Sequence, residues 1–108
     1  MNAELGDEIN PITCVDRLIH EPARLTIMAL LYVVHSADFV FLMSQTGLSW
    51  GNLSSHMSKL EGAGYIEVEK KFVQRRPQTM LRLTDKGRSA FREYRRSMKQ
   101  LLDDLPEG

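Results

Sequence analysis

The stretch GLSWGNLSSHMSKLEGAG, residues 47–64, has the pattern of an amphipathic helix with a defined start and end. Ser49 is a strong N-cap residue, because its side-chain oxygen can accept a hydrogen bond from a free backbone N–H group of the first turn. Gly62 and Gly64 predict the end of the helix, since glycine readily adopts the left-handed conformation that closes helices. The apolar residues between these points recur at i, i+4 and i+7 and predict a stripe that faces a core: Leu53, Met57 and Leu60.

The opposite face of this predicted helix carries short polar side chains. At about 100° per residue, this face collects Gly51, Asn52, Ser55, Ser58 and Lys59, with Ser54 at its edge. A helix face that meets only water usually carries pairs of Glu and Lys. Short hydroxyl and amide groups suit close contact with base-pair edges, so we interpret this face as a contact surface for DNA. A solvated amphipathic helix that happens to be rich in serine is the alternative.

Two segments with a period of two follow this helix. In residues 65–73, YIEVEKKFV, the apolar Ile66, Val68 and Phe72 alternate with charged side chains and predict the buried face of a half-buried strand. Residues 79–84, TMLRLT, predict a second strand. The intervening QRRPQ, residues 74–78, predicts a loop, so the hairpin tip holds Arg75 and Arg76. A guanidinium reaches far and keeps its charge, which suits a narrow minor groove or a pair of phosphates. A solvated turn is the alternative.

The residues before the central helix predict three further helices. Residues 12–20 predict a short first helix, and Pro22 predicts a new start, because proline suits a first helical turn. Residues 23–35 are apolar nearly all round and predict a buried helix. After a connection at 36–38, Asp38 is the expected N-cap of a helix over 39–46, and Gly47 begins the turn into the central helix. Two short helices joined by a tight glycine-containing turn form the helix-turn-helix pattern.

A last helix is predicted over residues 85–105, with Thr84 as its N-cap. Its apolar residues have the 3-4-3-4 spacing of a short coiled-coil seam: Phe91, Tyr94, Met98, Leu101 and Leu105. We expect this seam to form a dimer interface together with three residues of the first predicted helix, Ile12, Val15 and Ile19. Packing of the seam on its own domain is the alternative.

Length and composition point to one soluble domain over residues 1–108, with residues 1–10 as a flexible arm. The chain has 43% hydrophobic and 26% charged residues, which is ordinary for a globular protein. No apolar run approaches the roughly 20 residues that span a bilayer, and the N-terminus does not have the pattern of a secretory signal. Cys14 is the only cysteine, so the chain can form no internal disulfide. We therefore expect a cytoplasmic protein.

The net charge is zero, but the charges are unevenly distributed. Residues 1–48 carry six acidic and two basic side chains, whereas residues 49–96 carry eleven basic and five acidic ones. The last twelve residues carry three acidic side chains and one basic one. The basic block begins with the central helix and includes the hairpin. Such asymmetry is typical of an electrostatic footprint for phosphates.

The individual polar residues have different expected roles in DNA binding. Asn52 and Ser55 could read base edges or could contact phosphates only, and both alternatives stay open. The remaining polar residues of the helix are expected to position it on the phosphates: Ser49, Ser54, Ser58 and Lys59. Trp50 is expected to pack at the start of the helix, with stacking on a base as the alternative, and His56 is expected to be half-buried.

Several other functions have little support in the sequence. His20, His35 and His56 are too scattered to predict a metal site, and no cofactor is expected. Cys14 is expected to be a small apolar filler, with a redox role as the alternative. No catalytic triad, phosphate-binding glycine loop or zinc-helix motif is present, so we do not expect an enzyme.

The order of elements, with a hairpin and a helix after the helix-turn-helix, resembles the small winged-helix transcriptional regulators related to the MarR and ArsR families. The resemblance covers about residues 12–100. The matching pieces are Gly47-Leu48-Ser49, Leu53-Ser54-Ser55-His56, Lys59-Leu60-Glu61, Gly64-Tyr65-Ile66, Leu83-Thr84 with Gly87, and the upstream run from His20 to Leu25.

The resemblance implies a mainly α (α+β) fold, a winged helix-turn-helix with a two-stranded β wing and a C-terminal dimerisation helix. It also implies a homodimeric DNA-binding repressor or activator. The helix from Ser49 would lie in the major groove and the Arg75–Arg76 wing at the minor groove of an inverted-repeat operator. The alternative is a winged-helix module that docks a protein and binds no DNA, because fold alone does not determine function. A ligand-gated sensor would be an addition to the first hypothesis, but the sequence defines no effector.

Overall fold

The computed structural model describes residues 15–108. The predictions for the arm at 1–10, for Ile12 and for Cys14 lie outside these residues. The described elements follow one another in the order α2 (Pro22–Val34), β1 (Ser36–Asp38), α3 (Phe39–Thr46), α4 (Trp50–Gly62), β2 (Ile66–Val73), β3 (Arg76–Leu83) and α5 (Asp85–Asp103). The described residues thus combine four helices with a three-stranded antiparallel sheet, which confirms the predicted winged-helix fold.

The helix-turn-helix is formed by α3 and α4. Asp38 caps α3, where its carboxylate accepts a hydrogen bond from the Phe41 backbone N–H at 2.6 Å. Gly47 ends α3 with a φ of 71°, a left-handed conformation that glycine adopts without steric cost. Ser49 then caps α4 by accepting from the Asn52 N–H at 3.2 Å. These local hydrogen bonds explain why both helix boundaries were predictable from sequence.

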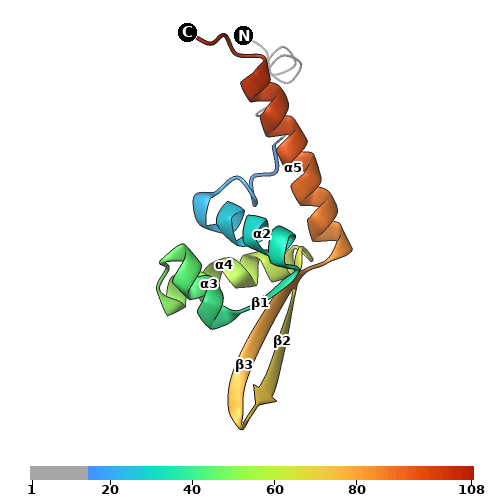
Figure 1. Ribbon diagram of the computed structural model, residues 1–108. Helices are drawn as coiled ribbons and strands as arrows, with labels where there is room; N and C mark the ends of the chain where they lie inside the picture. The colour runs from blue at the N-terminus through green and yellow to red at the C-terminus, as the bar shows by residue number, and fades with distance from the viewer. Residues whose placement is uncertain (1–14) are drawn as a thin grey trace.

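The wing is a longer and tighter hairpin than the sequence predicts. β3 pairs with β2 from Val73↔Arg76 to Ile66↔Leu83, so the connection is only Gln74 and Arg75 instead of residues 74–78. Pro77 is tolerated inside β3 because there β3 has a partner strand on one side only. The outer half of the hairpin extends beyond the body of the molecule (Figure 1). Phe72, which was expected on a buried face, is therefore 76% exposed.

The sheet has a third strand where a plain connection was expected. β1 pairs antiparallel with β3 on the side away from β2, with Ala37 opposite Leu81, and the strand order is β1-β3-β2. Both of these side chains are buried in the core. The predicted two-stranded wing is thus the outer part of a three-stranded sheet. Three residues are too short a segment for a strand pattern to be visible in the sequence.

The predicted first helix is wrong over its described part, since residues 15–20 form turns. The Asp16 carboxylate accepts hydrogen bonds from the backbone N–H groups of Leu18 and Ile19, at 2.9 and 3.3 Å. A side chain can accept from the backbone N–H groups two and three residues ahead in a turn or at a helix start, but not inside a helix, where these groups bond the preceding turn. The bonds of Asp16 therefore interrupt the predicted helix. The restart at Pro22 is confirmed, with Glu21 as the N-cap of α2.

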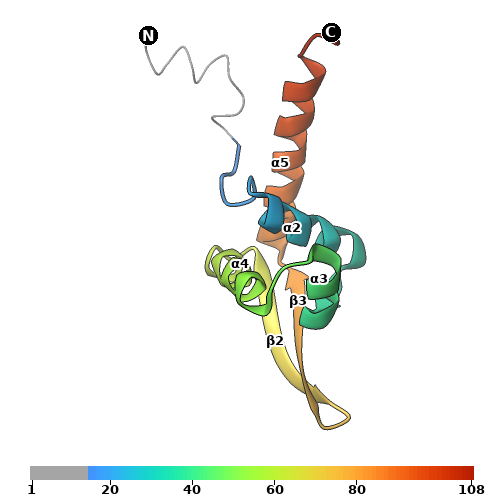
Figure 2. The same ribbon diagram turned by 90° about the vertical axis from the view of Figure 1, so that its left-hand side faces the viewer.

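The core lies between α2, the inner part of the sheet, α4 and α5. α2 contacts α3, α4, α5 and β3, and its side chains Ile27, Met28 and Leu31 are buried. The helix is nevertheless exposed at its end, where Val33 faces solvent. α5 rises from the base of the wing away from the body, so the wing tip and the C-terminus lie at opposite ends of the molecule (Figures 1 and 2). The principal dimensions are 59 × 29 × 24 Å.

Candidate nucleic-acid interface

The outward face of α4 is polar and accessible, as the sequence predicts. Leu53 and Leu60 are fully buried and hold the helix on the core, with Met57 packed beside them. The predicted DNA-contacting residues on the opposite face are all exposed, and Ser54 at its edge is half-buried: Ser49, Asn52, Ser55, Ser58 and Lys59. No acidic residue lies on this outward face. The face therefore offers hydroxyl, amide and ammonium groups to a ligand.

The inner side of α4 is fixed to α2 by polar contacts. The Arg24 guanidinium donates to His56 Nδ1 at 3.1 Å and, through Nε, to the Leu18 carbonyl at 2.6 Å. Glu21 accepts from the Arg24 backbone N–H at 2.9 Å, and this hydrogen bond, followed by the nearby His56, lowers the pKa of Glu21. His56 is half-buried, as predicted, but its partners belong to α2. These contacts fix how far α4 projects from the body.

The two predicted wing arginines occupy different positions. Gln74 and Arg75 form the turn, with φ of 52° and 65°, the two positive values that a type I′ hairpin turn requires. Arg75 therefore lies at the tip, whereas Arg76 is the first residue of β3. Residues 70–78 carry four basic side chains and no acidic one. None of these four forms a salt bridge within residues 15–108.

A groove of about 750 Å³ separates α4 from the wing. Phe39 and Val40 at the start of α3 form its floor, together with Trp50, Ser54 and Met57 of α4. The wing contributes the opposite wall, which includes Lys70, Val73, Arg76 and Gln78. Asp38 also lines the groove, where its carboxylate accepts a hydrogen bond from Gln78 at 3.3 Å. The groove thus joins the face of α4 to the basic wing.

Trp50 is the main functional candidate that the sequence analysis left out of the predicted DNA-contacting residues. It contacts Phe39 as expected for packing at a helix start, with ring centroids 5.7 Å apart. Its side chain is nevertheless 68% exposed and lines the groove. A second stripe at i, i+4 and i+7, formed by Trp50, Ser54 and Met57, was visible in the sequence. Only the position of the wing shows what that stripe faces.

The residues predicted for a dimer interface form two groups. Val15, Ile19, Phe91 and Tyr94 are buried inside the chain. The Phe91 ring lies 5.1 Å from that of Tyr32, and the Tyr94 hydroxyl lies 2.8 Å from His20 Nδ1. Met98 and Leu101 are half-buried. Leu105 is exposed and lies past the end of α5, which stops at Asp103 instead of the predicted residue 105. Only this second group has apolar surface to offer to a partner, and the interface itself stays a prediction.

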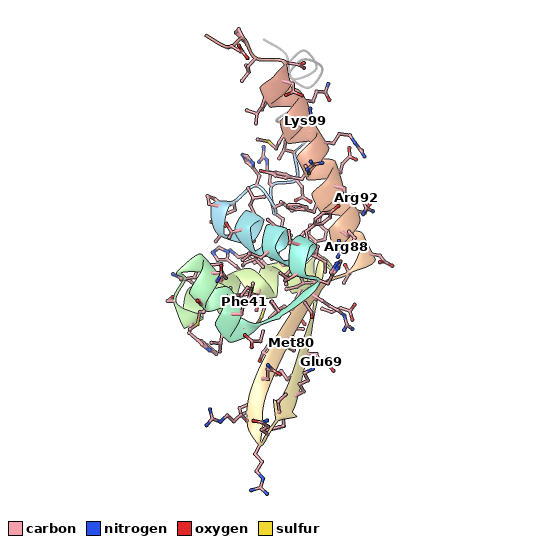
Figure 3. The ribbon with its side chains drawn as sticks, in the orientation of Figure 1. Phe41, Glu69, Met80, Arg88, Arg92 and Lys99 are labelled. Carbon is pink, nitrogen blue, oxygen red and sulfur yellow. The ribbon has the colours of Figure 1, made fainter. Side chains whose placement is uncertain are left out.

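The basic block of residues 49–96 forms two surfaces instead of one. One surface consists of Lys59 on α4 and the four basic residues of the wing tip. The lysines and arginines of α5 follow that helix away from the wing, as Figure 3 shows for Arg88 and Arg92. Arg88 is held over the Tyr32 ring, with its guanidinium carbon 4.9 Å from the centroid. The wing and α4 therefore carry the charge that belongs to the candidate interface.

Residues 15–108 contain neither a metal-binding cluster nor a membrane-spanning helix. No group of three or more His, Cys, Asp or Glu side chains there is arranged to hold a metal ion. None of the helices in this part of the chain is long and apolar enough to cross a membrane.

Comparisons with known proteins agree with this geometry. A family model described as a winged helix DNA-binding domain matches residues 23–102. An uncharacterised protein of Methanocaldococcus jannaschii is 35% identical over 89 residues, which cover 82% of this chain and 97% of that protein. A solved transcriptional regulator homologue from Pyrococcus horikoshii OT3 is 32% identical, with a TM-score of 0.78, over 83% of this chain and 91% of its own. A MarR-family structure from Porphyromonas gingivalis W83 is 18% identical, with a TM-score of 0.67, over 91% of this chain and 95% of its own.

The chain therefore belongs to the winged helix DNA-binding domain family, and its fold is that of MarR-family transcriptional regulators. The resemblance to the MarR-like regulators that the sequence motifs predicted is confirmed. The matched family and these structural neighbours are DNA-binding domains and transcriptional regulators, not enzymes.

Proposed function

We propose that this protein is a dimeric transcriptional regulator that binds a specific double-stranded DNA sequence and represses transcription by occupying it. The observation that carries the proposal is the polar, acid-free face of α4 beside a wing tip with four basic residues and no acidic one. An α-helix fits the major groove, where short polar side chains reach base edges. The exposed arginine at the turn suits the narrow, electronegative minor groove.

The proposed roles follow from position. Asn52 and Ser55, exposed at the centre of the outward face, would read bases, and the remaining polar residues of α4 would fix its register on the phosphates. Arg75 at the wing tip would enter the minor groove. In a dimer, the two copies of α4 would reach half-sites about one helical turn, roughly 34–36 Å, apart. The operator would then be an inverted repeat.

The dimer would form through the end of α5. Met98 and Leu101 are half-buried there, and Leu102 and Leu105 are 61% and 56% exposed. Exposed apolar side chains repeated along one helix stabilise a protein when a second helix covers them. This end lies opposite the wing, so pairing would leave both recognition surfaces free (Figure 2).

The first experiment is a titration of a labelled mixed-sequence duplex, followed by fluorescence anisotropy at low and moderate salt. We expect binding that weakens steeply with salt, because bound lysines and arginines release counterions from the phosphates. Selection from random duplexes should then recover an inverted repeat. Binding of no duplex at low salt would overturn the proposal and leave a protein-docking module as the explanation of the fold.

Two variants separate positioning from sequence recognition. Arg75→Gln should weaken binding to all sequences and lower the slope of log K against log salt by about one. Asn52→Ala should reduce the preference for the selected operator by about 5- to 100-fold, with the salt slope unchanged. Arg92→Gln is the matched control, since it removes the same charge from α5, far from the wing (Figure 3). If Arg92→Gln weakened binding as much as Arg75→Gln, the wing would have no special role.

A further inference from the structure

No role has yet been assigned to the groove between α4 and the wing. The proposed function determines which part of the DNA the groove would face. Each sugar–phosphate strand of a duplex separates the major groove from the minor groove. If α4 lies in the major groove and the wing tip lies at the minor groove, the space between them must straddle that strand. We propose that this groove seats one sugar–phosphate strand, with Lys70 and Arg76 on its phosphates and Trp50 on its deoxyribose. The inference rests on the proposed function.

The charges of the groove fit an anionic strand. Lys70 and Arg76 line its wing side and have no salt-bridge partner within residues 15–108. Asp38 is the only acidic residue in the lining. Its two carboxylate oxygens accept from the Phe41 N–H and from Gln78, so it is held at the base of the groove. The lining therefore has a net charge of +1, and the Ser54 hydroxyl on the α4 side can donate to a phosphate oxygen.

The apolar part of the groove fits a sugar. A free phosphate needs only cations and hydrogen-bond donors, whereas a nucleic-acid strand also presents the apolar edge of each deoxyribose. Trp50 offers a broad indole that is 68% exposed and braced at 5.7 Å by the Phe39 ring. This contact limits the rotation of the indole, so little conformational entropy is lost on binding. The indole N–H can donate to the adjoining phosphate.

Lys71, the neighbour of Lys70 on β2, provides a matched control for it. Successive side chains of a strand point to opposite faces. Lys70 lines the groove, whereas its neighbour Lys71 lines a separate depression together with Glu69. Figure 3 marks Glu69 halfway along the hairpin. The two lysines thus have the same charge and nearly the same distance from the tip, but of the two only Lys70 lines the groove.

The test measures how binding depends on single phosphates. The selected operator is prepared as a set of duplexes, each with one neutral methylphosphonate, and is titrated with wild type, Lys70→Gln and Lys71→Gln. At one or two positions per half-site, neutralisation should weaken wild-type binding about tenfold. Lys70→Gln should weaken binding to the unmodified operator and lower the salt slope by about one, as expected for one lost phosphate contact. It should also lose its sensitivity to the methylphosphonate at those positions, whereas Lys71→Gln should keep it.

Trp50→Ala tests the contact with the sugar. We expect about tenfold weaker binding to all sequences, the loss that corresponds to roughly 55 Å² of apolar contact. Trp50→Phe should restore most of the affinity, because an aromatic face remains. The circular-dichroism spectrum and urea midpoint of each variant show that it is folded.

Three outcomes have distinct meanings. Coupling of Lys70, but not Lys71, to a defined phosphate supports the inference. Equal effects of the two lysines, with no methylphosphonate position coupled to Lys70, would overturn it while DNA binding by the wild type still stands. A wild-type protein that binds no duplex would overturn the proposed function and this inference together.

Discussion

Gly87 is a single residue on which the junction between the wing and α5 depends. A Cβ atom at this position would lie 2.0 Å from the Tyr65 carbonyl oxygen and 2.8 Å from its carbon, both backbone atoms. This close approach accompanies the N-cap of α5, where the Thr84 N–H donates to the same carbonyl at 3.0 Å and the Thr84 hydroxyl accepts from the Gly87 N–H at 2.9 Å. Any side chain at residue 87 must push the helix away from the base of the wing.

We therefore expect Gly87→Ala to lower the free energy of unfolding by about 3 kcal/mol, at the upper end of the usual cost of overpacking. Urea denaturation followed by circular dichroism measures this change. Gly62→Ala is the matched control, because nothing lies within 4 Å of its added Cβ at the end of α4. It should leave stability unchanged or raise it by up to about 1 kcal/mol. A Gly87→Ala variant as stable as wild type would mean that α5 can shift freely.

Tyr65 gives the protein a predictable response to high pH. Burial, and after it the hydrogen bond that the Tyr65 hydroxyl donates to Asp16, raises the pKa of Tyr65 from 10.0 to about 12. Folding thus favours the neutral phenol. Its contribution to stability is complete below pH 10 and is lost as the pH rises towards 12. Phenolate absorbance should show one tyrosine ionising near pH 12 in the folded protein.

The Tyr65→Phe variant should lack this ionisation and should lose less stability between pH 10 and 12 than wild type does. In denaturant all tyrosines should titrate near pH 10. If the ionisation near pH 12 persisted in the folded variant, the assignment to Tyr65 would be wrong.

At the scale of elements, the parts of the fold that depend on local hydrogen bonds could be predicted from sequence. Ser49, Asp38 and Thr84 each cap a helix at the expected residue, where the side-chain oxygen accepts from the backbone N–H three positions ahead. Leu53 and Leu60 are buried as the helical period requires. These features need only neighbours within about one helical turn, so a sequence pattern contains them in full.

The parts that depend on distant segments could not be predicted in the same way. β1 exists because Ala37 meets Leu81, 44 residues further on. The wing turn lacks the Asn-Gly signature of a two-residue hairpin, so the pairing of β2 with β3 determines its length. Phe72 follows the alternation of a half-buried strand but lies on a hairpin that projects past the core.

The candidate site could likewise be predicted only in part from sequence. The outward residues of α4 follow from helical geometry alone, and all lie where the sequence placed them. The groove could not be predicted from sequence. Trp50 lies on α4 and Lys70 on β2, and the distance between these elements depends on the angle of the wing. Arg75 and Arg76 are adjacent in sequence, yet the turn between β2 and β3 separates their positions.

At the scale of the whole molecule, the shape separates two surfaces with different chemistry. The wing projects from the body, which contains α4, to one end of the molecule, and α5 extends to the other end (Figure 1). The wing and α4 carry exposed polar and basic groups, whereas the end of α5 carries exposed apolar side chains. Leu102 and Leu105 remain exposed beside the half-buried Met98 and Leu101. A single chain has no element left among residues 15–108 to cover the end of α5 (Figures 1 and 2). A second copy would bury this surface and bring two DNA-contacting faces into one particle.

Substitution of Leu101 therefore tests the proposed dimer. Leu101→Glu places a charge on the apolar side of α5, where pairing would have to desolvate it, so we expect the wild-type dimer to become a monomer. Sedimentation equilibrium measures the mass directly, against 12.4 kDa for one chain. The monomer should bind a single half-site as wild type does, but should bind the full inverted repeat at least about tenfold more weakly, because the two half-sites are no longer linked.

Gln100→Glu is the matched control, since it adds the same charge one residue away at an exposed position of α5. It should keep both the dimer mass and the affinity for the full operator. A wild type that sediments as a monomer at the concentrations used for DNA binding would contradict the proposed dimer. The same conclusion would follow if Leu101→Glu and Gln100→Glu sedimented alike. In either case α4 and the wing could still bind DNA, but the operator would have to be recognised by one chain at a time.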